Sequence, residues 1–178
     1  MYPWLRLSKT MFDGRKLPPM SLLDTHVSQH RVSLFDCDIF MEMNNGRILT
    51  MFEMGRFQMA QRVGLWQMLK DKEWGFAVAG SSVRYRKRLV PWERYEMRTQ
   101  MLGWDERFSY FQQGMFKMSG ECANHALFRT AVVHKHRGVP TTEVAEAMGA
   151  DHDTGALPAW VKAWTEAEAQ RPWPPMQD

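Results

Sequence analysis

The sequence has little of several features that mark whole classes of proteins. It contains two cysteines, Cys37 and Cys122, and no Cys-x-x-Cys pair. This excludes a disulfide framework and a cysteine-based zinc site, and it suits a reducing compartment. No stretch approaches the roughly 18 apolar residues that a membrane span requires. Charged residues interrupt the first 16 positions, which therefore lack the apolar core of a signal peptide. We expect a soluble, cytoplasmic protein with no membrane span.

A large excess of one charge is also missing. The 178 residues carry 23 Lys and Arg against 20 Asp and Glu, a net charge of +3. Nucleic-acid binders usually gather far more positive charge on one face, so we expect no nucleic-acid partner. The 44% of apolar and 24% of charged residues are typical of one globular domain. Fifteen Met and eight Trp fit either a methionine-rich core, the simpler interpretation, or an adaptable surface for an acyl chain.

The hydrophobic pattern predicts one strand, one long helix and four further strands. Alternation over residues 27–38 indicates the first strand. Asn44 or Asn45 is a good N-cap for a helix whose apolar stripe includes Ile48, Phe52 and Met59. Gly55 weakens that helix by about 1 kcal/mol unless the helix approaches a sheet closely there.

Strands are then predicted over residues 83–90 and 94–104 and in the two segments that follow, arranged as an antiparallel meander. A short helix capped by Thr141 or Thr142 ends at Gly149, and a last helix covers residues 158–169. We expect an N-terminal arm (1–26), one domain (27–149), and a C-terminal helix with a loose tail (150–178). The fold class is α+β, with a long central helix wrapped by a curved antiparallel sheet.

Paired acids precede the predicted start of the long helix. Asp36 and Asp38 flank Cys37 and would lie at the end of the first strand. An ionised carboxylate such as that of Asp38 can orient water or attack directly. Backbone N–H groups at residues 45–47 could form an oxyanion hole at the positive end of the helix. Aspartates near a strand end are also ordinary turn residues; the helix start beside them slightly favours a site.

These residues resemble the hotdog-fold thioesterases, in the branch of hydroxybenzoyl-CoA thioesterase and the bacterial acyl-CoA thioesterases. The resemblance covers residues 27–149 and rests on the Asp-Cys-Asp motif, the two asparagines, Glu53 and Arg56. It implies hydrolysis of an acyl-CoA or an acyl carrier protein, with Asp38 as the catalytic carboxylate. It also implies a homodimer or a dimer of dimers, and we expect the strand at 83–89 to form the shared edge.

The sequence departs from the family pattern at three positions. Glu42 stands where the family often has His, Met41 replaces the turn glycine, and Ile48 replaces a frequent tyrosine. These changes leave a non-catalytic acyl-CoA-binding protein as the alternative function.

The candidate catalytic residues are Asp38, Asn45 and Asp36, and the candidate substrate-binding residues are Asn44, Gly46, Arg47, Arg84 and Arg86. Arg84, Arg86 and Arg88 could meet CoA phosphates or an acidic carrier, although a solubilising strand face is the simpler interpretation. Glu53 and Arg56 are spaced for an ion pair on one helix face. His134 and His136 have no third ligand nearby in the pattern, so no metal and no cofactor is implied.

Overall fold

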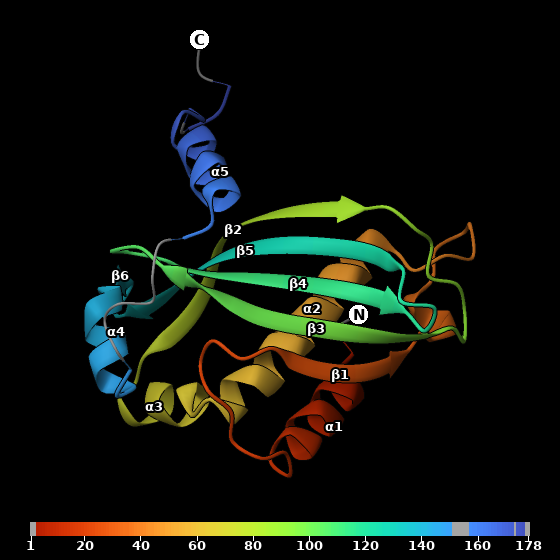
Figure 1. Ribbon diagram of the computed structural model, residues 1–178, viewed down its shortest axis with the longest axis horizontal. Coiled ribbons are helices and arrows are strands. Elements are labelled where there is room, and N and C mark those ends of the chain that lie inside the picture. The colour runs from red at the N-terminus through yellow and green to blue at the C-terminus, as the bar shows by residue number, and fades with distance from the viewer. Residues whose placement is uncertain (1–2, 151–156, 173, 177–178) are drawn as a thin grey trace.

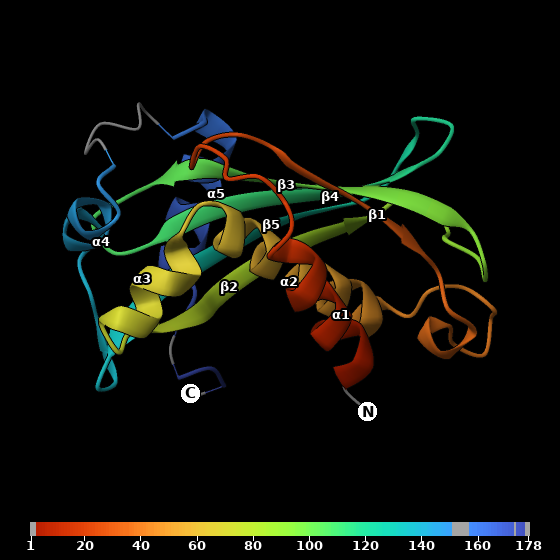
Figure 2. The same cartoon turned by 90° about the horizontal axis from the view of Figure 1, so that it is seen from below.

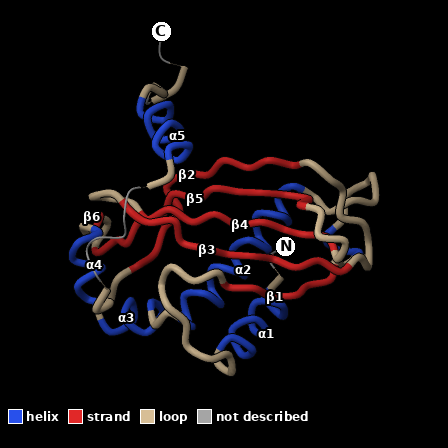
Figure 3. The backbone as a smooth tube through the Cα atoms, in the orientation of Figure 1, coloured by secondary structure: helices blue, strands red, loops and turns tan. Residues whose placement is uncertain are grey.

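The computed structural model describes residues 3–150, 157–172 and 174–176. Its centre is a curved antiparallel sheet whose strands follow the order β1-β3-β4-β5-β2, with the short β6 paired to β5 (Figures 1 and 3). The strands are β1 (His26–Arg31), β2 (Gly75–Tyr85), β3 (Arg94–Trp104), β4 (Ser109–Lys117), β5 (Cys122–His134) and β6 (Arg137–Gly138).

The long helix α2 (Asn45–Arg62) lies against one face of this sheet (Figure 2). Its stripe of Ile48, Phe52 and Met59 is buried together with side chains from the sheet that include Met97 and Phe128. Apolar residues at helical spacing on α2 therefore meet apolar residues at alternate positions on the strands, which is the expected α+β arrangement.

Gly55 marks the closest approach of α2 to the sheet. A Cβ atom there would lie 2.7 Å from Met97 Cε and 2.8 Å from Thr99 Oγ1. These separations are below van der Waals contact, so the glycine is needed for packing. The close approach that could compensate for a glycine inside the helix is therefore present.

The strand pattern needs three corrections. Only β3, β4 and β5 form a meander, because β2 pairs with β5 at one edge of the sheet and not with β3. Strand β2 begins at Gly75 and ends at Tyr85, so residues 86–89 belong to a loop. The first strand ends at Arg31 and not near residue 38, since a 3-10 turn, η1 (Leu34–Asp36), follows it.

The predicted N-terminal arm contains a helix, α1 (Trp4–Gly14). This helix packs on α2 through the buried residues Thr10 and Gly14, while Leu5 and Phe12 are exposed. Spacing in this segment is helical, but the prolines and aromatics at its ends obscured that signal.

The remaining helices are α3 (Leu65–Asp71), α4 (Thr141–Ala147) and α5 (Ala159–Ala169). Helix α4 follows Pro140 and uses no threonine side chain as its cap; the Thr141 hydroxyl instead donates to the Asp105 carbonyl. Helix α5 matches the predicted last helix and packs on the sheet face opposite α2 (Figures 1 and 2), where its Val161 meets Tyr110 and Leu127. Part of the C-terminal segment, residues 151–156, 173 and 177–178, lies outside the described residues. Among the helices described, none is long and apolar enough to span a membrane.

Two histidines of β1 are buried in the neutral form. Arg62 Nη1 can only donate, so it fixes His26 Nδ1 as an acceptor at 3.0 Å and leaves Nε2–H to donate to Gln58 Oε1 at 3.2 Å. Burial lowers the pKa of His26. Burial, together with the charge of Arg6, lowers the pKa of His30 to about 4, and its ring stacks on Tyr95 at 5.4 Å.

These histidines predict a loss of stability in mild acid. Above pH 6.5 they are neutral in both states, whereas below it the unfolded chain binds protons that folded His30 refuses until about pH 4. His30 alone should therefore lower the free energy of unfolding by about 2.5 kcal/mol between pH 7.5 and pH 4.5. The variant His30→Gln should flatten this dependence in urea denaturation, and His136→Gln in the β5–β6 hairpin should not. An unchanged pH dependence in His30→Gln would contradict the assignment.

Candidate active site

The chain turns sharply between β1 and α2. Ser33 Oγ accepts a hydrogen bond from the Phe35 N–H at 3.3 Å, and Asp36 Oδ2 accepts one from the Ser33 N–H at 3.0 Å. This reciprocal capping box closes η1 and turns the Asp36 side chain inward. The two aspartates therefore do not share one strand face, as a continuous strand would require.

Asp36 is the charged centre of this turn. Its side chain is 4% exposed, and its two oxygens face Arg6 Nη1 at 2.7 Å and Arg47 Nε at 3.4 Å. Its backbone carbonyl also accepts from the Asn44 N–H at 2.9 Å. The residue thus joins α1, the turn and the start of α2. Both predicted site residues, Asp36 and Arg47, have their charges engaged with each other here.

Asp38 begins a five-residue turn that returns the chain to α2. Its N–H donates to the Glu42 carbonyl at 2.9 Å, and a bridge between Cys37 and Met43 closes the turn behind it. Asp38 Oδ1 accepts from the Phe40 N–H at 2.9 Å. Its carboxylate forms no ion pair with any side chain of the described residues. Of the two acids, Asp38 is the one that remains available for chemistry.

The cysteine between the acids is not an activated thiol. Burial, followed by the negative charges of Asp36 and Asp38, raises the pKa of Cys37. A thiol is nucleophilic as the thiolate, so this environment disfavours Cys37 as the attacking group.

The start of α2 is built as predicted, with one refinement. Asn44 is the N-cap, and its Oδ1 accepts from the Gly46 N–H at 2.9 Å. This hydrogen bond uses one of the three N–H groups that could have formed an oxyanion hole. Asn45, the first helical residue, is exposed, and within the described part of the chain its N–H has no acceptor. The Asn45 N–H is therefore a donor that a carbonyl oxygen could reach.

A hollow of about 210 Å³ lies beside this helix start. Asn45, Arg86 and Glu42 line it, and Glu42 Oε2 pairs with Arg88 Nε at 3.1 Å. Asp38 is not among its lining residues; it stands across the turn from Glu42. Arg84 lies elsewhere, on the sheet face that α5 covers. Strand alternation would keep Arg84 and Arg86 on one face, but β2 ends at Tyr85, so Arg86 lies in the loop that follows and lines the hollow at the helix start.

A larger apolar cavity of about 520 Å³ lies along the second half of α2. Sequence patterns gave no indication of it, because its walls come from separate segments whose meeting depends on the position of β2. Glu53, Arg56 and Lys70 are its charged residues. Its apolar walls include Phe57, Met59, Trp66, Trp74, Phe76 and Phe111. Several of the abundant Trp and Met residues thus line a cavity and are not only core.

Among the described residues, no group of three or more His, Cys, Asp or Glu side chains could hold a metal ion. His134 lies at the end of β5 and His136 follows in the turn to β6, so they do not share one strand.

The chain is similar to known proteins in its sequence and its fold. The family model of the Thioesterase-like superfamily matches residues 32–165. The chain belongs to this superfamily. It is 27% identical to the THEM6 protein of Drosophila melanogaster over 92% of this chain and 84% of that protein. It is 33% identical to THEM6 of Danio rerio over 54% of this chain, a match that spans only 48% of the fish protein.

Among solved structures, the probable thioesterase YbaW from Escherichia coli superposes with a TM-score of 0.64 at 17% identity. The superposition covers 68% of this chain and 95% of YbaW. The hotdog fold and the resemblance to its thioesterases, expected from the Asp-Cys-Asp and Asn-Asn motifs, are confirmed.

The ion pairs of Asp36 predict a large effect on stability. Asp36→Asn leaves Arg6 and Arg47 partly buried beside a neutral group, which should lower the free energy of unfolding by about 3 kcal/mol. Asp13→Asn, which breaks the exposed pair with Lys9, should cost less than about 1 kcal/mol. Urea denaturation of both variants measures the difference. Equal, small losses would show that Asp36 does not hold the turn.

Proposed function

We propose that this protein hydrolyses an acyl thioester, of CoA or of an acyl carrier protein. The observation that carries the proposal is the Asp38 carboxylate. It has no ion-pair partner among the described residues and lies in a turn that backbone hydrogen bonds join to the start of α2. Membership of the thioesterase-like superfamily supports the reaction class.

The chemistry needs an acceptor for a proton or an acyl group and a donor for the developing oxyanion. The Asn45 N–H, at the positive end of α2, would donate to the thioester oxygen. Asp38 would act either as a base or as a nucleophile. As a base it takes a proton from water, the water oxygen bonds to the acyl carbon, and the carbon–sulfur bond breaks with the proton passing to the thiolate. As a nucleophile its carboxylate oxygen bonds to the acyl carbon, the carbon–sulfur bond breaks and the thiolate leaves; water then hydrolyses the mixed anhydride to the free acid and regenerates the Asp38 carboxylate.

Two hollows would bind the two ends of the substrate. Arg86, Lys87 and Arg88 line the hollow at the helix start and suit the phosphates of CoA or of a carrier's phosphopantetheine arm. The apolar cavity suits the acyl chain. It begins at Glu53, eight residues or about 12 Å along α2 from Asn45.

A homodimer would bring these parts closer together. Strand β2 is hydrogen-bonded to β5 on one side only and exposes Phe76 and Val78 next to the cavity. Antiparallel pairing of β2 with its copy would continue the sheet across a two-fold axis. The two α2 helices would then run in opposite directions, so the cavity of one protomer would lie towards the helix start of its partner. The shared edge is thus β2, which contains only the first residues of the segment 83–89 expected from the sequence.

The test of the reaction is release of free thiol from a panel of acyl-CoAs. Asp38→Asn should lower kcat by about 10²- to 10⁴-fold, the usual contribution of a general base, and a nucleophilic role would cost more. Asp71→Asn, an exposed acid on α3, should leave kcat unchanged. Single turnover in ¹⁸O-water separates the two roles, because only a nucleophilic Asp38 acquires the label. Full activity in Asp38→Asn would remove this residue from the mechanism.

A second candidate function is binding of acyl-CoA without turnover. It is favoured by Glu42, which stands in the hollow at the helix start and is paired with Arg88, so that no imidazole is available there. Tight acyl-CoA binding with no thiol release from any member of the panel would establish this function in place of hydrolysis.

The dimer has its own matched pair of variants. Val78→Lys on β2 places a charge on the proposed interface and should halve the mass measured by light scattering at micromolar concentration. Val27→Lys is the control, because Val27 lies on the opposite edge strand, β1, and is 46% exposed, close to the 49% of Val78. It should leave the mass unchanged. A monomeric parent protein, or dissociation by Val27→Lys alone, would refute the β2 interface.

A further inference from the structure

Helix α5 stands away from the sheet on part of its length and leaves a hollow of about 430 Å³. The hollow lies between α5 and strands β2, β4 and β5, on the face opposite α2 (Figures 1 and 2). It is therefore separate from both hollows assigned to the thioester. Its lining residues are Ser82, Arg84, Gln112, His125, Leu127, Trp160 and Trp164.

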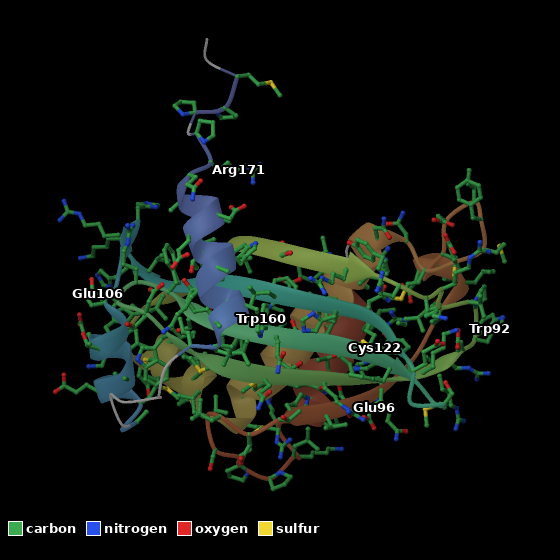
Figure 4. The ribbon with its side chains drawn as sticks, turned by 45° about the horizontal axis from the view of Figure 1, so that its top comes forward. Trp92, Glu96, Glu106, Cys122, Trp160 and Arg171 are labelled. Carbon is green, nitrogen blue, oxygen red and sulfur yellow. The ribbon has the colours of Figure 1, made fainter. Side chains whose placement is uncertain are left out.

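Flat rings form its walls. Trp160 lies where α5 meets the sheet (Figure 4), with 45% of its surface exposed and its ring centroid 5.9 Å from that of His125. Trp164 is held more firmly, because the Arg129 guanidinium packs on its ring at 5.3 Å. The Trp164 ring lies over Gly80, where an added Cβ would be in ordinary van der Waals contact with it at 3.4 Å. A partly exposed indole beside a fixed one offers a surface on which a planar ring can stack.

The polar groups of the hollow favour an anion. Arg84 is exposed and forms no ion pair with the described residues. Burial, with the charge of Arg84 as a second cause, lowers the pKa of His125, so the imidazole is neutral near pH 7. The side chain of Gln112 faces His125 Nε2 at 3.4 Å. Among the described residues, the lining carries one full positive charge, neutral hydrogen-bonding groups and no carboxylate.

We propose that this hollow binds a purine mononucleotide. The base would stack on Trp160, and a phosphate would pair with Arg84, whose planar guanidinium matches phosphate geometry. The volume suits a small ligand, since such sites begin at about 300 Å³. A long acyl chain would find little apolar wall here, because Leu127 is the one aliphatic side chain among the lining residues.

Calorimetric titration of the full chain with ADP tests the proposal without any turnover. One ADP should bind per chain. Arg84→Gln and Trp160→Ala should each weaken binding about tenfold, the usual effect of losing a charge-assisted pair or a stacking ring. Trp160→Phe keeps a flat ring and should bind within about threefold of the parent. Arg137→Gln, an exposed arginine on β6, should have no effect.

Two further titrations assign the parts of the ligand. Adenosine should bind more weakly than ADP to the parent protein. Adenosine and ADP should bind to Arg84→Gln with equal affinity, because neither ligand can make the phosphate contact with that variant. Binding of ADP that is lost in Arg86→Gln and retained in Arg84→Gln would place it at the helix start and overturn the proposal. No ADP binding at millimolar concentration would overturn it as well.

Discussion

One buried carboxylate holds together the segments around the start of α2. Asp36 pairs with an arginine of α1 and an arginine of α2. Its side chain accepts a hydrogen bond from the N–H of Ser33, which caps η1, and its backbone carbonyl accepts one from the N–H of Asn44, which caps α2. A charge taken out of water is costly unless it is paired and hydrogen-bonded. Here α1 and α2 supply the paired charges, and the turn between β1 and α2 supplies the hydrogen bond. The turn that contains Asp38 is consequently fixed at both ends by contacts that do not involve the Asp38 carboxylate. Of the two acids of the motif, Asp36 holds the structure, and Asp38 is the one to which the proposed function assigns the chemistry.

The end of β2 at Tyr85 separates the arginines of the basic run. Tyr85 and Arg86 line the hollow beside the start of α2, whereas Arg84, one residue earlier, lies under α5. The basic run predicted as one surface is therefore divided, because the alternation that would keep Arg84 and Arg86 on one face stops where β2 ends at Tyr85. The same strand, at the open edge, also borders the apolar cavity through Phe76 and Val78. Its position beside β5 connects the three hollows and the proposed dimer interface.

The sequence was informative where local rules decide the structure. Asn44 and the apolar stripe of α2 located the central helix, and Gly55 indicated its contact with the sheet, because capping, periodicity and steric fit act over a few residues. The order of strands was predicted incorrectly, since pairing of β2 with β5 depends on contacts far apart in the chain. Strand β1 was predicted too long for a related reason. The apolar–polar alternation of β1 continues past Arg31, but the capping box of Ser33 and Asp36 turns the chain into η1 there. Sequence periodicity does not indicate this capping box. The partner of Asp36 on α1, Arg6, could not be found from the motif at all.

The departures from the family pattern now have a physical setting. Met41 has φ of 58°, a left-handed conformation that costs a non-glycine residue about 1–2 kcal/mol. The hydrogen bonds between Asp38 and Glu42 and the bridge between Cys37 and Met43 hold the turn in this shape despite that cost. A glycine at position 41 would relieve the strain without being needed to form the turn. Glu42 is different, because its carboxylate already pairs with Arg88 at the hollow. A substrate phosphate of the proposed acyl-CoA that competes for Arg88 would release Glu42 as a second acid facing the helix start.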